Sequence, residues 1–316
     1  LSSWWATRTG FDVVHSHENT WHGQVQTVHV LPVRYTLFRG RNGLRLALRW
    51  LKVATSPRLL AYLWLEAGRY RPRGNRRVVV TSPTLGAVMA GTYPRTIPML
   101  EVLAPGVSRV DGVASTQDQL AARRALGLPA EGHCILFVAN DYEKKGLGTL
   151  LQAMRLLPDE AYLSVVGNAA HIAAFKRQAQ ECGVVSRVFF QGAQRDMGVA
   201  YRAADCLAHP TLEDTFAMVV LEAMAHGLPV VVSGARYCGI SSLLVHSEQA
   251  LILENPLDAK EIADQLQSTW TDEVLRHRLV QNGLKFAHSY LWAEIAARQE
   301  SIYASVVART DGDNAV

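Results

Sequence analysis

The chain has 316 residues, of which 49% are hydrophobic and 19% are charged, and its formal net charge is +4 at pH 7. This length suffices for two domains with separate hydrophobic cores, and the composition excludes a disordered chain. No apolar run approaches the ~20 residues of a membrane-spanning helix, and the first residues lack the basic start of a secretory signal peptide.

The cysteines at positions 134, 182, 206 and 238 are widely spaced and include no C-x-x-C pair. This spacing indicates neither a zinc site nor a disulfide framework. We therefore expect buried, reduced thiols in a cytosolic protein.

Short strands are predicted in the first part of the chain at residues 12–17, 25–31, 77–81 and 102–103. His15 and His17 fall on one face of the first strand, because side chains alternate along a strand. Metal binding by these histidines is disfavoured, because the sequence offers no evident third ligand. The strands indicate one α/β unit.

The segment between Arg34 and Arg77 carries twelve basic residues and one acid, so its net charge is +11 and the rest of the chain carries −7. Arg45, Arg49 and Lys52 are spaced to form one basic stripe on a helix, beside apolar residues. Such a helix can lie on an anionic membrane surface, or it can be the solvated face of a core helix. Nucleic acid is disfavoured as a partner, because no binding motif accompanies the charge.

The second half of the chain alternates strands with helices. An interdomain connection is expected at residues 108–132, with a helix at 117–126. The strands that follow are predicted at residues 134–139, 162–166, 188–190 and 230–233, and the helices at 147–157, 170–182 and 197–204. This alternation is typical of a parallel, doubly wound sheet that is covered on both faces.

Two lysines, Lys144 and Lys145, follow the first of these strands and precede a helix. Ligands of open α/β sheets bind beyond the carboxyl ends of strands, where a lysine can neutralise a diphosphate leaving group. Two lysines at a helix start are unfavourable to the helix dipole, which favours the functional interpretation.

The stretch from Asp214 to Val232 predicts a turn, an apolar helix with one carboxylate, a glycine stop and a buried strand. That carboxylate, Glu222, is costly to bury unless a partner such as a sugar diol satisfies it. The alternative is that Glu222 points to solvent or pairs with an arginine. Asp214 can be a simple helix cap, but free amides at Phe216 and Ala217 would also form an anion site.

Residues 209–229 resemble the donor-site signature of family 4 glycosyltransferases, which are retaining enzymes of the GT-B fold. The signature has an acid, seven residues and then a glutamate. Here Asp214 stands where the family usually has Glu, and Ala217 stands where it usually has Gly. The likeness extends over most of residues 100–308 and loosely over 10–40, and it is strongest to the branch that glycosylates lipopolysaccharide cores and other bacterial surface glycans.

The resemblance implies an α/β GT-B architecture with two Rossmann-like domains, the first of them incomplete at its amino-terminal side. The expected division is an acceptor-side domain at 1–115, a nucleotide-sugar domain at 116–290, a helix at 291–308 that crosses back to the first domain, and a disordered tail at 309–316. The implied activity is transfer of a hexose, with UDP-glucose as the favoured donor, to a glycolipid or polysaccharide acceptor with retention of configuration. A non-catalytic nucleotide-sugar-binding fragment and a nucleotide-sugar epimerase are the alternatives. An anionic membrane is a further candidate partner, which would place the protein at the cytoplasmic face of the inner membrane, and no metal or other cofactor is expected.

The resemblance also implies roles for individual residues. Lys145 would neutralise the diphosphate with help from Lys144, Glu222 would bind the ribose hydroxyls, and Asp214 would bind the sugar hydroxyls. His17, next to Glu18, would contact the transferred sugar. The expected catalytic residues are His17, Lys145 and Asp214, and the expected donor-binding residues are Lys144, Gly192, Arg195, Thr215, Phe216, Ala217, Met218 and Glu222.

Overall fold

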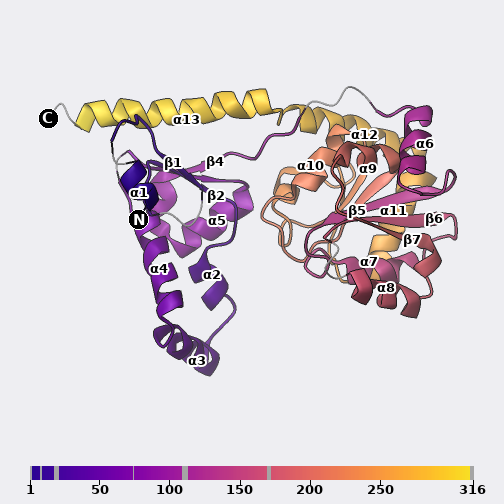
Figure 1. The fold of residues 1–316 in the computed structure, drawn as a ribbon, viewed down its shortest axis with the longest axis horizontal. Helices are drawn as coiled ribbons and strands as arrows, with labels where there is room; N and C mark the ends of the chain where they lie inside the picture. The colour runs from indigo at the N-terminus through magenta and orange to yellow at the C-terminus, as the bar shows by residue number, and fades with distance from the viewer. Residues whose placement is uncertain are drawn as a thin grey trace. The chain divides into compact units, whose positions relative to one another are not determined.

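A computed structural model describes residues 2–7, 9–17, 21–73, 75–108, 113–168 and 172–313. The chain divides into two compact units, of which unit 1 comprises residues 1–105 and 293–316 and unit 2 comprises residues 106–292. The boundaries predicted from the sequence fall instead after residues 115 and 290. Each unit is an α/β structure built on a parallel sheet (Figure 1).

Unit 1 contains a sheet of four strands in the order β1-β2-β3-β4. The strands are β1 (His15–His17), β2 (Val25–Val28), β3 (Arg77–Val80) and β4 (Leu100–Val102). Helices α2 (Val33–Phe38), α4 (Pro57–Arg69) and α5 (Pro83–Thr92) lie on one side of this sheet, and α13 (Trp292–Asp313) lies on the other (Figure 1). The remaining elements are α1 (Ser2–Ala6), α3 (Gly43–Ala54) and η1 (Pro94–Met99). Strands β2 and β3 are buried along their whole length, as expected for parallel strands covered on both faces.

Unit 2 contains a sheet of six strands in the order β10-β9-β8-β5-β6-β7. The strands are β5 (His133–Ala139), β6 (Ala161–Gly167), β7 (Val188–Gly192), β8 (Cys206–His209), β9 (Val230–Ser233) and β10 (Leu251–Leu253). The chain runs outward from β5 to β7, returns to β8 on the other side of β5, and runs outward again to β10. The predicted doubly wound parallel sheet is therefore confirmed in unit 2.

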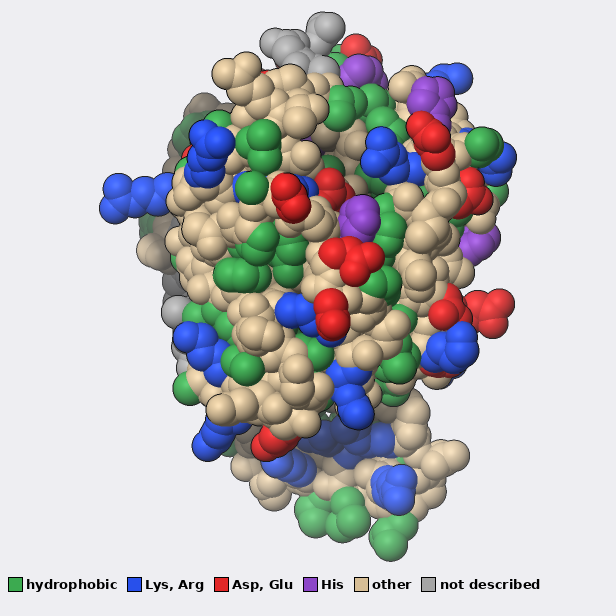
Figure 2. Space-filling model, turned by 90° about the vertical axis from the view of Figure 1, so that its right-hand side faces the viewer, with side chains coloured by type: hydrophobic (Ala, Val, Ile, Leu, Met, Phe, Trp, Pro, Cys, Tyr) green, Lys and Arg blue, Asp and Glu red, His purple; other side chains and the backbone are tan. Residues whose placement is uncertain are grey.

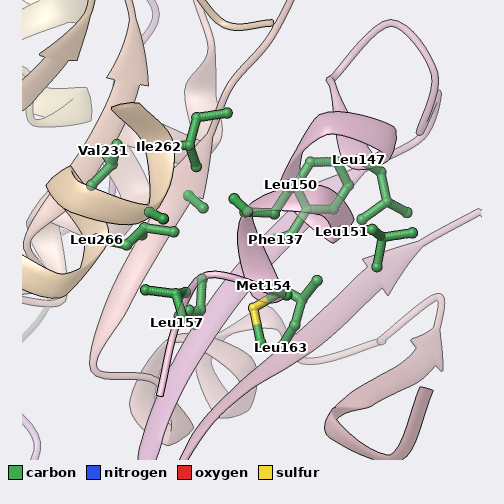
Figure 3. Packing of buried hydrophobic residues seen from close by; sticks show 14 of the residues in the cluster. Phe137, Leu147, Leu150, Leu151, Met154, Leu157, Leu163, Val231, Ile262 and Leu266 are labelled. Atoms are coloured by element: carbon green, nitrogen blue, oxygen red, sulfur yellow. The ribbon is translucent and has the colours of Figure 1, made fainter. Parts of the chain in front are cut away.

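Helices cover both faces of this sheet (Figure 1). One face carries α6 (Thr116–Ala125), α9 (Met197–Ala203) and α10 (Met218–Ala225), and the other carries α7 (Leu147–Met154), α8 (Ile172–Glu181) and α11 (Ala259–Thr271). Helix α12 (Glu273–His288) packs against α10 and α11, and the short turns η3 (Val185–Arg187) and η4 (Gly239–Leu243) complete the unit. The main core forms between the sheet and α7 and α11, where Phe137, Leu150 and Leu266 are fully buried (Figure 3). Burial of each such side chain contributes about 1.5–3 kcal/mol to folding.

Several elements differ from the expectation. Strands β8 and β10 were not predicted, because both are short apolar runs that periodicity alone does not assign. Helix α13 extends to Asp313 and so enters the predicted tail, whose last residues, 314–316, lie outside the described part of the chain. Residues 170 and 171 of the predicted helix at 170–182 also lie outside it.

Candidate active site

The candidate site lies at the carboxyl ends of β5 and β8, which are neighbours in the six-stranded sheet. The chain leaves β5 toward one edge of the sheet and leaves β8 toward the other, so the strand order reverses between these two strands. Such a topological switch point is where open α/β sheets bind ligands. The loop after β5 contains Lys144 and Lys145, and the loop after β8 contains Asp214.

The two loops are fastened together by main-chain contacts. The Leu212 N–H donates to the Lys144 carbonyl oxygen at 2.8 Å. Gly146 has φ +81°, and a side chain there would collide with the Pro210 carbonyl oxygen. Glycine is therefore required at position 146, because it alone combines the left-handed conformation with this close approach.

Lys145, Asp214 and His209 form one hydrogen-bonded group at this switch point. The Lys145 Nζ lies 2.7 Å from Asp214 Oδ2 and 2.8 Å from the Glu213 carbonyl oxygen. The His209 Nε2 lies 3.2 Å from the same Asp214 oxygen, and the His209 side chain is only 1% exposed. The structure thus brings together Lys145 and Asp214, which the sequence predicted separately.

The surroundings of His209 and Asp214 determine the charges of these two side chains. Burial lowers the pKa of His209, so its imidazole is neutral at pH 7 and donates through Nε2. Burial raises the pKa of Asp214, but His209 and the Lys145 ammonium outweigh burial and hold this pKa well below its ordinary value. Asp214 is therefore a carboxylate that faces an ammonium group, a pair that can separate to meet a ligand carrying both phosphates and hydroxyls.

His209 is the member of this group for which the sequence predicted no role. It is the last residue of β8, and a polar side chain at the carboxyl end of a buried strand is a signal for a site residue. The signal was missed because the strand itself was not predicted.

Helix α10 begins at Met218, one residue after Ala217, which adopts a left-handed conformation with φ +76°. The Phe216 N–H donates to Asp214 Oδ1 at 3.1 Å, so the predicted free amide at Phe216 is wrong. Asp214 takes this amide because its short side chain can fold back on its own turn. Thr215 lies within the same turn, and Ala217 and Met218 remain at the helix N-terminus, where amides have no partner within the helix.

Glu222 lies one turn inside α10 and is half-buried. The Tyr201 hydroxyl, which comes from α9, donates to Glu222 Oε2 at 2.6 Å. Tyr201 is 2% exposed, and its ring stacks on His226 at a centroid distance of 4.7 Å. Neither alternative interpretation, a solvated glutamate or an arginine pair, describes this arrangement, because the partner of Glu222 is a buried tyrosine.

Two of the expected donor-binding residues, Gly192 and Arg195, stand further out along the same edge of the sheet. Gly192 ends β7 with φ +66°, and Arg195 is exposed in the loop that follows. Strand β6 separates β7 from β5, so these residues lie two strands away from the strand that precedes Lys145.

His17 ends β1 in unit 1, where its Nδ1 lies 3.0 Å from His29 Nε2. The neighbouring His15 is held by the Thr27 hydroxyl at 2.6 Å and the Tyr303 hydroxyl at 2.7 Å. The pKa of His15 is lowered to about 4, mainly by burial and further by the charges of the nearby His17 and His29. His15 is thus a neutral side chain held in the structure, and Glu18 lies outside the described residues.

Arg45, Arg49 and Lys52 lie in α3 of unit 1. Their leucine neighbours Leu44, Leu48 and Leu51 are 76%, 57% and 62% exposed, so this helix does not turn an apolar face to a core. Only Val53 is buried among the residues of α3. Figure 2 shows hydrophobic side chains and Lys or Arg side chains close together at the end of unit 1 that α3 forms in Figure 1.

The sequence profile of one family, described as glycosyl transferases group 1, matches residues 118–286. The match covers more than half of the chain and includes the loops after β5 and β8 together with α10. The chain belongs to the group 1 glycosyltransferases.

Curated relatives of this group 1 glycosyltransferase agree with that family. A D-inositol 3-phosphate glycosyltransferase of Xylanimonas cellulosilytica is 29% identical over 253 residues, which are 75% of this chain and 60% of the relative. The lipopolysaccharide glucosyltransferase WaaG of Escherichia coli K12 is 29% identical over 178 residues, which are 55% of this chain and 43% of the relative. The chain spans about half the length of the curated relatives it matches, between 43% and 60%.

Solved structures resemble the chain over most of its length. The crystal structure of WaaG, a glycosyltransferase involved in lipopolysaccharide biosynthesis, has a TM-score of 0.74 at 20% identity and covers 88% of this chain and 74% of WaaG. HepE of Anabaena in complex with UDP-glucose has a TM-score of 0.71 at 18% identity and covers 91% of this chain and 72% of HepE. At these identities the likeness shows the fold, and the predicted GT-B class is confirmed.

Proposed function

We propose that this group 1 glycosyltransferase transfers a hexose from a nucleotide sugar, with UDP-glucose as the favoured donor, to a lipopolysaccharide core or another cell-surface glycan. The observation that carries the proposal is the contact between Lys145 and Asp214 at the switch point of the sheet. One group can neutralise a diphosphate, and the other can accept hydrogen bonds from sugar hydroxyls.

Donor binding would exchange partners within this group. The diphosphate would take the Lys145 ammonium from Asp214, and the released carboxylate would accept hydroxyls of the sugar. His209 would keep its hydrogen bond to Asp214 and so hold the carboxylate in place while Lys145 moves. The N-terminus of α10, with Ala217 and Met218, would add a favourable helix dipole for the phosphates.

Glu222 would bind the ribose of the donor. The Tyr201 hydroxyl occupies one oxygen of this carboxylate, and the other is left to accept from a diol. Gly192 and Arg195 would border the base at the outer strand. His17 keeps the role that the family resemblance implies, contact with the hydroxyls of the transferred sugar.

The reaction would proceed with retention of configuration. In this mechanism the bond between the anomeric carbon and the diphosphate would break, and the acceptor oxygen would bond to that carbon on the same face. Lys145 would stabilise the negative charge that develops on the phosphate, and that phosphate would accept the proton of the acceptor hydroxyl. Stabilisation of a leaving group by one such charge contributes about 3 kcal/mol to catalysis.

The exposed leucines of α3 and its basic side chains support association with an anionic membrane surface. Exposed leucines beside arginine and lysine suit a helix that lies in the lipid headgroup region. Trp50, also exposed, stacks on Phe38 of α2 at a centroid distance of 4.5 Å, which adds an aromatic side chain to this surface. None of the helices in the described part of the chain has the length and apolarity needed to cross a bilayer.

Calorimetric titration with UDP and GDP, followed by a turnover assay with UDP-glucose, tests the proposal. We expect UDP to bind more tightly than GDP, and Glu222→Gln to weaken UDP binding at least tenfold, because hydrogen bonds to a charged group contribute about 1.5–3 kcal/mol. Binding without turnover would indicate a nucleotide-sugar-binding protein without transferase activity, and an absence of nucleotide binding would refute the proposal.

A further inference from the structure

A cavity of about 300 Å³ lies in unit 1. The end of α4 and the loop after it, the start of α2, and the junction of α5 with η1 form its walls. Its charged and aromatic lining consists of Arg34, Arg71, Arg95, Tyr70 and Tyr93. The remaining lining residues are alanine, threonine and two prolines.

The lining is positively charged, because it contains three arginines and no aspartate or glutamate. None of the ion pairs formed among the described residues involves these three guanidinium groups. The Arg34 guanidinium carbon lies 5.8 Å from the centre of the Tyr93 ring, which keeps this cation at the wall of the cavity.

Glu66, which precedes the lining residue Ala67, is an acid that is already engaged. Its Oε1 accepts from the Val33 N–H at 2.6 Å, and its Oε2 accepts from the Arg34 N–H at 2.9 Å and from the Tyr93 hydroxyl at 2.7 Å. These three donors hold the carboxylate against the start of α2. Three guanidinium groups and one engaged carboxylate leave a net charge of about +2 at the cavity, which matches a dianion.

The cavity is separate from the candidate active site. Tyr93 and Arg95 follow the carboxyl end of α5 and precede β4, so they lie toward the amino-terminal edge of the unit 1 sheet. His17 ends β1 and therefore lies at the opposite edge, and the residues around Lys145 belong to unit 2.

We propose that this cavity binds a phosphate monoester, carried either by a small molecule such as a sugar phosphate or by a phosphorylated lipid headgroup. Guanidinium groups bind phosphate oxygens through paired hydrogen bonds, and the tyrosine and proline walls suit the apolar face of a sugar ring or glycerol backbone. The volume is at the lower end of the range for small-molecule sites, which suits a ligand of this size.

Calorimetry of the full chain with glucose 6-phosphate, and with glucose as the uncharged control, tests the first source. We expect saturable binding of glucose 6-phosphate, none of glucose, and at least a tenfold loss of affinity in the double variant Arg71→Gln/Arg95→Gln. The matched control is Arg124→Gln/Arg155→Gln, which removes the same charge from exposed positions in unit 2 and should bind as the wild type does. An equal loss in both variants would mean unspecific attraction, and displacement of the ligand by UDP would mean binding at the donor site. Either result would overturn the proposal.

Flotation with phosphatidylcholine vesicles that contain phosphatidic acid, a lipid phosphate monoester, tests the second source. The measurement uses the Arg45→Gln/Arg49→Gln/Lys52→Gln variant as background, which removes the contribution of α3. Lipid binding that depends on Arg71 and Arg95 would support the proposal with a lipid as the source, even where glucose 6-phosphate does not bind. If neither ligand binds through these arginines, and circular dichroism shows that the variants are folded, the proposal is wrong.

Discussion

The carboxylate of Asp214 contacts two side chains, and it also accepts one main-chain N–H of its own turn. Lys145 and His209 contact one of its oxygens, and the Phe216 N–H donates to the other. A glutamate would place its carboxylate one methylene further out and could not close this short turn in the same way. The aspartate is therefore fitted to this turn, although the family usually has a glutamate at this position.

Tyr201 is a positioning residue for Glu222 within the proposed function. Tyr201→Phe keeps the ring on His226 and removes the hydroxyl, so we expect UDP binding about five- to tenfold weaker than in the wild type, measured by calorimetry. The control Tyr162→Phe removes another buried hydroxyl, which donates to the Pro129 carbonyl oxygen at 3.0 Å in the same unit. Equal UDP affinities in the two variants would show that Tyr201 acts only on folding.

Ala217 adopts a backbone conformation that favours glycine. A left-handed alanine costs about 1–2 kcal/mol, whereas removal of its buried methyl group costs about 0.8 kcal/mol. We expect Ala217→Gly to change the free energy of unfolding by less than about 1 kcal/mol and to lower the KM for UDP-glucose several-fold, because the donor phosphates can approach the backbone more closely. Thermal denaturation and donor kinetics measure the two effects, and an unchanged or raised KM would contradict the expectation.

The strands of unit 2 differ in how far the sequence predicts them. The long buried strands β5 and β6 were predicted within one residue at each end, because their apolar runs are flanked by clear turn signals. The four residues of β8 follow closely after α9, and cysteine and alanine do not favour a strand strongly. Position in the sheet, rather than local propensity, makes this segment a strand.

The sequence likewise predicts only part of the candidate site. Lys145, Asp214 and Glu222 stand in sequence patterns that are visible without a structure. His209 and Tyr201 obtain their roles from contacts with those residues, across five positions for His209 and twenty-one for Tyr201. Such contacts depend on the packing of the whole unit, which periodicity and motif spacing do not specify.

Helix α3 carries the prediction about the membrane. We expect the wild type to bind vesicles that contain phosphatidylglycerol, with affinity that falls as salt is added, because exposed charges are screened over ~8 Å at physiological ionic strength. Arg45→Gln/Arg49→Gln/Lys52→Gln should lower the affinity for these vesicles at least tenfold, since each basic residue near the membrane surface contributes about 1 kcal/mol to binding. UDP binding should stay unchanged, because the donor residues lie in unit 2. Vesicle binding that survives this triple substitution would show that α3 is only a solvated helix.

The whole chain distributes its proposed functions between two units. Unit 2 contains the switch-point group and most of the core, whereas unit 1 contains His17, the basic segment and the arginine-lined cavity. The basic segment gives unit 1 a charge that would attract anionic acceptors such as phosphorylated glycolipids. Binding of the donor diphosphate, however, would involve unit 2 alone, at the loops after β5 and β8.

Titration of Lys145→Ala with UDP and with uridine tests that claim most directly. Lys260→Ala is the matched control, since Lys260 also pairs with an aspartate, Asp264, but on the exposed surface of α11. We expect Lys145→Ala to weaken UDP binding by about tenfold to a hundredfold and to leave uridine binding, followed by NMR, unchanged, because in the proposed function the lysine would contact only the phosphates. Lys260→Ala should match the wild type for both ligands. If Lys145→Ala binds UDP as tightly as Lys260→Ala does, the donor diphosphate does not bind at the switch point.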